Sequence, residues 1–336
     1  MPVAVVTLPN LPKRVVRLSR ELERALRQSK RFTIKTHGLD RRQLLLEGQR
    51  IRPSNWRKHR VVLKLGLTQK GEAELLLFSP PKRRATWRMR QPYAREADAP
   101  RVARIFLDSL SRRLLGAHTY YASQIAFVRG RGKRSRVYVM NMLDGTPRPV
   151  SATNKESVLP AWSPRGGLAF SSYLWRNPDL FIIRDLAGRG RSYRISRHPG
   201  LNIGAAFSPK GNQLALTLSK DGNAEVYLLR TNGKVIRRLT HHRRIDTSPS
   251  FSPDGQEIAF VSERAGAPQL FVMPTAGGTP RQLTSRGSYN QEPAWCPTVA
   301  CPWIAFTHRN DEGVYEITLV HRRKRTLRRV TRGRSP

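Results

Sequence analysis

The chain has 336 residues, with 62 Lys and Arg against 23 Asp and Glu, so its formal net charge is +39. This length allows two domains, and a hydrophobic content of 38% is typical of a folded protein, which excludes a disordered chain. No apolar run of about 18 residues occurs, so no transmembrane helix is expected.

The positive charge indicates either a negatively charged partner or a proteome with high arginine usage. Candidates for such a partner are nucleic acid, phosphate-rich lipid headgroups and acidic envelope polymers. Lys and Arg are spread along the chain and form no concentrated basic tail. The charge alone therefore identifies no ligand.

The N-terminal third predicts a small α/β domain. A β-branched run at residues 3–8 is typical of a strand, and apolar residues then recur at helical spacing from Val15 to Leu26. A second amphipathic helix is predicted at 100–115, where Gly116 supplies the C-terminal cap. Between the two helices, strands are predicted at 31–36, 61–68, 72–78 and 86–92, and a short helix at 41–47.

An internal repeat occupies the rest of the chain. An aromatic residue followed by Ser-Pro or Cys-Pro recurs at Trp162, Phe207, Phe251 and Trp295, at spacings of 45, 44 and 44 residues. Most of these anchors lead into a Gly-containing turn, and all are followed by short β-runs such as Ile258-Ala259-Phe260. Four short strands in about 44 residues are the period of a propeller blade, in which small sheets stack radially.

The repeats predict an α/β domain over residues 1–118 and an all-β propeller over 119–336. Four blades are complete, and a first fragment has three strands and lacks its inner strand. Two explanations are open, either five sheets that close imperfectly or a truncated or decayed propeller, and an unclosed ring leaves sheet edges free to pair. The predicted repeats lie near 124–158, 159–203, 204–247, 248–291 and 292–336.

Several motifs resemble the TolB family of the Tol-Pal system. They include Ser250-Phe251-Ser252-Pro253-Asp254-Gly255, Gly266-Ala267-Pro268-Gln269-Leu270-Phe271 and the segment from Leu283 to Asn290. The resemblance extends to the N-terminal domain, at residues 20–32 and 104–116. It implies a six-bladed propeller, a monomeric scaffold that is not an enzyme, and a periplasmic location, although no signal-peptide pattern is visible at the N-terminus.

The resemblance also implies partners and a binding surface. Such scaffolds bind the lipoprotein Pal at one mouth of the propeller channel, engage the inner-membrane protein TolA through their N-terminus, and support outer-membrane integrity, cell division and bacteriocin import. The mouth residues are expected just before each inner strand, and the family interface maps best onto Leu201, Gly204 and Thr247. The full predicted set is Val158, Leu159, Leu201, Asn202, Gly204, Asp246, Thr247, Asn290 and Gln291.

Motifs for catalysis are not found. No Gly-x-Ser-x-Gly elbow, glycine-rich phosphate loop or zinc-ligand spacing occurs, so no catalytic residue, metal, cofactor or small-molecule substrate is predicted. Two other functions stay open, a basic propeller that binds nucleic acid or other polyanions, and a regulatory propeller separated from a hydrolase domain. Cys296 and Cys301 flank a predicted turn and are candidates for a disulfide in an oxidising compartment.

Overall fold

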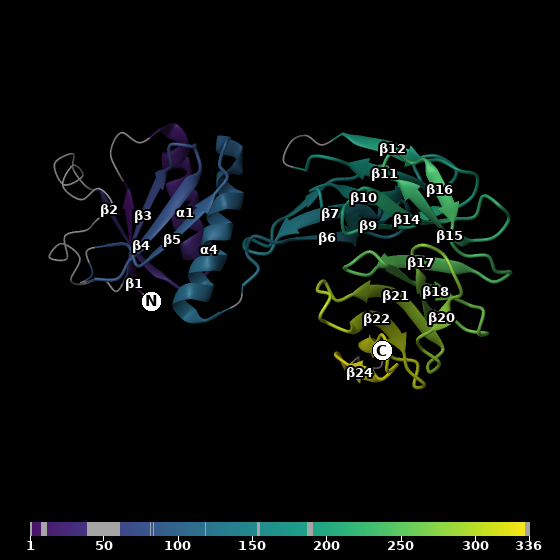
Figure 1. The fold of residues 1–336 in the computed structure, drawn as a ribbon. Helices are drawn as coiled ribbons and strands as arrows, with labels where there is room; N and C mark the ends of the chain where they lie inside the picture. Colours follow the sequence, from purple (N-terminus) through teal and green to yellow (C-terminus); the bar gives the residue numbers. More distant parts are fainter. Residues whose placement is uncertain are drawn as a thin grey trace. The chain divides into compact units, whose positions relative to one another are not determined.

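The chain forms two compact units in the computed structural model (Figure 1). The first unit contains Met1–Ile125 and Met140–Pro147, and the second contains Ala126–Val139 and Arg148–Pro336. The predicted short helix at 41–47 lies outside the described residues. The structure describes residues 2–7, 12–38, 61–80, 82, 84–117, 119–152, 155–186 and 191–332.

A mixed sheet is the framework of the first unit. Its strands are β1 (Pro2–Thr7), β2 (Thr33–Gly38), β3 (Val61–Leu67), β4 (Ala73–Phe78) and β5 (Trp87–Gln91). β1 pairs in parallel with β2 and β3, whereas β3, β4 and β5 pair antiparallel, so the strand order is β2-β1-β3-β4-β5. The three antiparallel strands are the neighbours that their alternating sequence predicts.

The helical elements that the structure describes in this unit are α1 (Lys13–Gln28), a 3-10 helix η1 (Glu96–Asp98) and α4 (Ala99–Leu115). The two α-helices pack against each other and against the sheet, because each buries one apolar stripe, represented by Leu18 in α1 and Phe106 in α4. α4 ends at Gly116, which takes a left-handed φ of 63° as the sequence predicts.

Five antiparallel sheets follow, and the inner strand of each of the last four begins two or three residues before the predicted start of its repeat. The first is three-stranded and the others are four-stranded, with the inner strand first in the sequence. Their strands are β6 (Gln124–Arg129), β7 (Arg136–Asn141), β8 (Pro147–Pro149); β9 (Ser157–Trp162), β10 (Leu168–Ser172), β11 (Asp179–Ile183), β12 (Ser192–Ser196); β13 (Asn202–Phe207), β14 (Gln213–Leu218), β15 (Glu225–Arg230), β16 (Val235–Arg238); β17 (Asp246–Phe251), β18 (Glu257–Ser262), β19 (Gln269–Pro274), β20 (Arg281–Gln282); β21 (Tyr289–Trp295), β22 (Trp303–Arg309), β23 (Tyr315–His321) and β24 (Leu327–Arg329).

Apolar side chains fill the junctions between successive sheets. Between β13–β16 and β17–β20, Leu228 and Leu239 form one buried cluster with Phe251 and Phe260. The middle strands of a sheet bury both faces in this way. The sequences of β14 and β18 are therefore short, continuous apolar runs. The sheets are thus held face to face by the hydrophobic effect.

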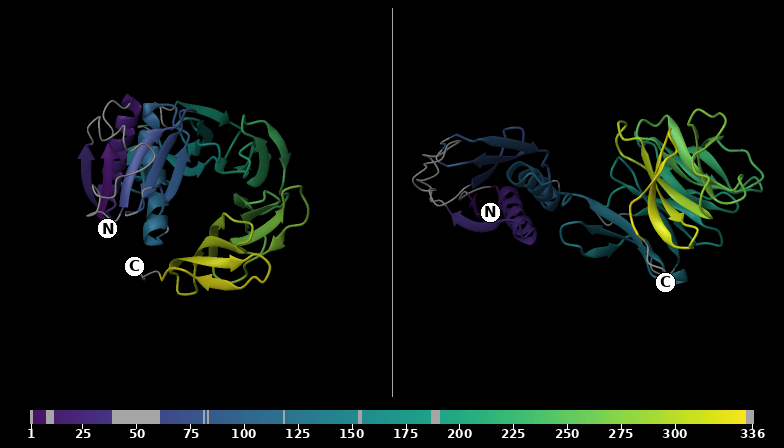
Figure 2. Two further views of the ribbon diagram at one scale, coloured as in Figure 1. Left: turned by 60° about the vertical axis from the view of Figure 1, so that its left-hand side comes forward. Right: turned by 90° about the horizontal axis from the view of Figure 1, so that it is seen from below.

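The last sheet, β21–β24, has a face that no described sheet covers. Ile317 and Val330 are 40% and 56% exposed, whereas Leu270 and Leu283, at the same positions of the preceding repeat, are 0% and 2% exposed. Within the described residues, no element of this sheet makes an extensive contact with β6, β7 or β8. Figure 2 shows the sheets of the second unit following one another around an arc. The prediction of four complete blades and a three-stranded first sheet is confirmed.

Candidate partner-binding site

The inner strands β9, β13, β17 and β21 are neighbours, and the residues at their N-terminal ends form what we call the mouth of the propeller. The sequence predicts that the candidate residues lie just before these strands. This prediction holds for Leu201 and is wrong for the others, which lie inside the strands. The strands begin earlier because pairing resumes beyond a bulge, as at Thr247 opposite Val261. The candidates that lie inside strands are Val158, Leu159, Asn202, Gly204, Asp246, Thr247, Asn290 and Gln291.

The same bulge recurs in all four inner strands, three residues before the aromatic anchor. The residue there has a positive φ, which is 53° at Leu159, 66° at Gly204, 52° at Ser248 and 55° at Glu292. The pairing register with the second strand shifts next to each of these residues. Because the left-handed conformation costs a non-glycine residue about 1–2 kcal/mol, the paired segments on both sides hold the backbone in place.

Three of the candidates, Asn202, Asp246 and Asn290, occupy one repeat position and are fully buried. Asn202 joins its strand to the end of the preceding sheet. Its Oδ1 accepts hydrogen bonds from the hydroxyl of Ser196 at 2.6 Å and the N–H of His198 at 2.9 Å, and its Nδ2 donates to the carbonyl of His198 at 2.7 Å. We call such a buried, hydrogen-bonded side chain a fastener, because it stabilises the junction between two sheets.

Asn290 has the same role at the next-but-one junction. Its Nδ2 donates to Oε1 of Gln269 in β19 at 2.6 Å and to the carbonyl of Arg286, in the loop before β21, at 2.9 Å. Its Oδ1 lies 2.6 Å from Nδ1 of His308 in its own sheet. Since these side chains have no exposed surface, they position the mouth and do not themselves touch a partner.

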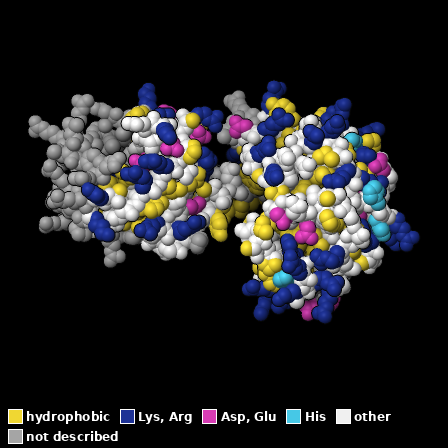
Figure 3. Space-filling model, in the orientation of Figure 1, with side chains coloured by type: hydrophobic (Ala, Val, Ile, Leu, Met, Phe, Trp, Pro, Cys, Tyr) yellow, Lys and Arg dark blue, Asp and Glu magenta, His cyan; other side chains and the backbone are white. Residues whose placement is uncertain are grey.

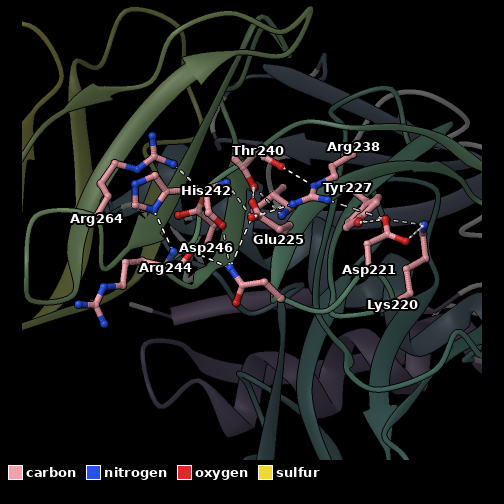
Figure 4. A network of polar contacts seen from close by, with 12 residues as sticks. Lys220, Asp221, Glu225, Tyr227, Arg238, Thr240, His242, Arg244, Asp246 and Arg264 are labelled. Atoms are coloured by element: carbon pink, nitrogen blue, oxygen red, sulfur yellow. Dashed lines mark hydrogen bonds and ion pairs between the residues drawn. The ribbon is translucent and has the colours of Figure 1, made fainter.

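The third of these residues, Asp246, has an ionisable side chain, and it adjoins a second buried carboxyl group, that of Glu225 (Figure 4). Asp246 Oδ2 accepts from Nη2 of Arg264 at 2.7 Å. Glu225 accepts from Nη2 of Arg238 at 2.9 Å and from the hydroxyl of Thr240 at 2.6 Å. Burial raises the pKa of Asp246 above its ordinary value, although Arg264 acts in the opposite direction.

The turn between β14 and β15 carries a further polar cluster. Asp221 Oδ2 accepts from the hydroxyl of Tyr227 at 2.5 Å and from Nζ of Lys220 at 2.8 Å. The hydrogen bond from Lys220, followed by that from Tyr227, lowers the pKa of Asp221. Burial, followed by the hydrogen bond to Asp221, raises the pKa of Tyr227 to about 12. The charges of Lys220 and Asp221 thus pair with each other at the edge of the mouth.

The candidate set therefore divides into buried and accessible members. Sequence reasoning missed two bulge residues, Ser248 and Glu292, which share a repeat position with Gly204. The signal that could have identified them is the fixed distance of three residues to each aromatic anchor, with glycine in one repeat marking a positive φ. The accessible or half-buried candidates are Val158, Leu159, Leu201, Gly204, Thr247 and Gln291.

Cys296 and Cys301 form a disulfide across the turn between β21 and β22, with their Cα atoms 5.9 Å apart. The backbone N–H of Cys296 also bonds to the carbonyl of Trp303 at 3.0 Å, so the bridge lies at the closed end of a hairpin. Among the described residues, no three His, Cys, Asp or Glu side chains lie close enough together to hold a metal ion.

The surface is strongly basic. The face drawn in Figure 3 shows Lys and Arg side chains over both units and few Asp or Glu side chains. In the described part of the chain, no helix has both the length and the apolar character that crossing a membrane requires.

Comparison with known proteins identifies relatives that match part of the chain. The Tol-Pal system protein TolB of Desulfosudis oleivorans is 35% identical over 170 residues, which cover 50% of this chain and 38% of that protein. A protein TolB homolog of Chlorobaculum tepidum is 38% identical over 138 residues, covering 40% and 31% of the two chains. The matched segments therefore span about a third of the length of these relatives, 38% and 31%.

Solved structures and a protein family extend this comparison. The crystal structure of TolB from Acinetobacter baumannii matches 98% of this chain and 82% of its own, with a TM-score of 0.65 at 23% identity, so the two share a fold. The TolB beta propeller domain family matches residues 111–336, which contain every sheet of the repeat array. From its repeats, its sheets and this match, the chain belongs to the TolB β-propeller family.

Proposed function

We propose that this protein is a non-enzymatic scaffold of the Tol-Pal system that binds the lipoprotein Pal at the propeller mouth. The observation that carries the proposal is the recurring bulge, which presents accessible residues at the same place on four neighbouring strands of a TolB-family chain. Rigid strands on both sides hold these residues ready for binding, so little ordering entropy is lost when a partner docks.

Accessible residues at the mouth are the proposed contacts. Leu201, Gly204 and Thr247 lie at neighbouring inner strands and are half-buried. A partner that docks at the mouth covers the part of their surface that is still exposed. Val158, Leu159 and Gln291 extend the same surface across β9 and β21. The buried residues Asn202, Asp246 and Asn290 support this surface from within.

The test is calorimetric titration of the purified chain with the soluble domain of a Pal protein encoded by the same genome. Thr247→Arg places a long charged side chain in the proposed interface, and we expect it to weaken binding at least tenfold. Ile236→Arg is the matched control, because Ile236 is 40% exposed on the outer strand β16. Absence of binding at micromolar concentrations, or equal losses in both variants, contradicts the proposed site.

The wider role follows from the same family membership. We propose a periplasmic location, an interaction of the N-terminal part with TolA, and support of outer-membrane integrity, cell division and bacteriocin import. Leakage of periplasmic enzymes from a strain that lacks the gene, and its reversal by the intact gene, test this role. The domain limits 1–118 and 119–336 stay a prediction, which limited proteolysis near residue 118 tests.

A second candidate function, binding of polyanions, is favoured by the net charge of +39. Counterion release makes such binding fall steeply with salt. A fluorescent single-stranded oligonucleotide measured by anisotropy from 50 to 200 mM salt distinguishes the two functions. Salt-insensitive binding, or none, removes this candidate.

A further inference from the structure

The loop from His241 to Ile245 concentrates positive charge beside the mouth. It connects the outer strand β16 to the inner strand β17, and its sequence is His-His-Arg-Arg-Ile. His241, Arg243 and Arg244 are exposed, and Ile245 is 41% exposed. Thr247, one of the proposed contacts, lies only two residues beyond the loop.

Side-chain hydrogen bonds hold the backbone of this loop in place. Nδ2 of Asn223 donates to the carbonyls of His242 and Arg244, each at 2.9 Å. Oε1 of Glu225 accepts from the N–H of His242 at 2.8 Å, and Nδ1 of His242 accepts from the N–H of Arg244 at 3.0 Å. The loop backbone is thus anchored by two neighbouring side chains, Asn223 and Glu225, and Figure 4 shows Glu225 near His242.

Among the described residues, no carboxylate forms an ion pair with the two arginines of the loop. Glu225 and Asp246, the carboxylates beneath the loop, are fully buried and paired with Arg238 and Arg264. In the part of the chain that the structure describes, neither Arg243 nor Arg244 forms an ion pair. Their guanidinium groups are therefore available to a ligand.

This concentration of charge is particular to one junction. The corresponding loops before β13 and β21 contain a single Arg each, Arg197 and Arg286. The His-His-Arg-Arg run includes no Phe, Tyr or Trp side chain on which a nucleotide base could stack, whereas Ile245 offers an apolar contact of the kind that protein partners use. The combination fits carboxylates spaced along a polypeptide better than it fits a nucleic acid.

We propose that residues 241–245 dock an acidic, extended segment of the protein partner that binds at the mouth. Carboxylates of that segment pair with Arg243 and Arg244, where the planar guanidinium can donate two parallel hydrogen bonds. The anchored backbone presents these groups without further ordering. This inference rests on the proposed function in one respect, namely that a protein binds the mouth.

The test measures binding of a fluorescent 12-residue peptide in which Glu alternates with Gly around a central Leu. A peptide with Gln in place of Glu is the neutral counterpart. The double variant Arg243→Gln/Arg244→Gln removes the two proposed contacts, and we expect it to weaken binding of the acidic peptide about tenfold. Asn223→Ala keeps the charge but releases both carbonyls, and we expect a loss of about threefold from the greater freedom of the loop.

A matched control separates local recognition from the overall field. Arg323→Gln/Lys324→Gln removes the same charge from the exposed turn between β23 and β24, and we expect less than a twofold change. An equal loss in both double variants, or equal binding of the neutral peptide, overturns the inference. So does an oligonucleotide of equal charge that binds more tightly and depends equally on Arg243 and Arg244.

Titration with Pal separates this inference from the proposed function. If Pal does not bind while the acidic peptide binds through the loop, the proposed function fails and the proposed site for an acidic segment stands. If Pal binds and the Arg243→Gln/Arg244→Gln variant binds it equally well, the function stands and the inference is overturned. Circular dichroism of each variant confirms that the exposed substitutions leave the fold unchanged.

Discussion

Replacement of Leu283 by Ala removes a side chain on which the junction between the last two sheets depends. Leu283 is 2% exposed and belongs to one buried cluster with Ile304 and Phe306 of the following sheet. A Leu→Ala change at such a site costs the transfer free energy of the lost methyl groups plus the energy of the remaining cavity. We expect the free energy of unfolding to fall by about 2–5 kcal/mol.

Val330 occupies the same repeat position in the last sheet. The Thr after Leu283 accepts a hydrogen bond from the N–H of Leu270 at 2.9 Å, and the Thr after Val330 accepts one from the N–H of Ile317 at 2.8 Å, so the two positions correspond. Val330 is nevertheless 56% exposed, because no described sheet follows it. Val330→Ala should therefore change the free energy of unfolding by about 0.5 kcal/mol or less.

The assay is urea denaturation at pH 7 and low micromolar concentration, followed by tryptophan fluorescence and circular dichroism. Val226→Ala is the control of equal size, since Val226 is fully buried at the preceding junction, and we expect a loss of about 1.5–3 kcal/mol. If Val330→Ala costs as much as Val226→Ala, then a further sheet or a second molecule covers this face in solution, and the reasoning from the exposed fraction is refuted.

Three further predictions concern the mouth and its supporting network. Gly204→Ala should lower the free energy of unfolding by about 1 kcal/mol, because the φ of Gly204 is 66°. Ser248→Gly, at the corresponding bulge, should not lower it. Chemical denaturation measures both variants, and equal losses would contradict the argument. Burial raises the pKa of Asp246, so its contribution to stability is greatest below the unfolded pKa and is lost as pH rises through the folded pKa. The free energy of unfolding of Asp246→Asn relative to that of the parent should therefore increase with pH above about 4. A difference that does not change with pH would refute this. Tyr227, with a pKa of about 12, should lose its proton at lower pH when Asp221→Asn removes the hydrogen-bonded carboxylate, as ultraviolet titration of the phenol can show; an unchanged midpoint would exclude that role of Asp221.

Most of the fold could be predicted because it is built from local patterns. The spacing of Trp162, Phe207, Phe251 and Trp295 reports a repeating unit that has to bury both faces against its neighbours, and this requirement determines the four-stranded sheets. The two helices of the first unit could be predicted for a similar reason, since their apolar stripes recur at helical spacing.

The candidate site could be predicted only in part, because its residues depend on contacts between sheets. Asn202 and Asn290 have the polar character of surface residues, and sequence alone cannot show that hydrogen bonds from the preceding sheet compensate their burial. The bulges were missed for a related reason. Leu159 and Glu292 carry no local preference for a positive φ, and only the pairing on both sides imposes it.

The sequence by itself determined the number of sheets in the repeat array, their internal strand order and the family of the chain, because these follow from periodicity and short motifs. The tertiary structure decided which polar residues are fasteners, which side chains remain accessible at the mouth, and that the loop from His241 to Ile245 is held in place. These properties arise where residues distant in the sequence meet. Their burial and hydrogen bonding exist only after the sheets have packed together.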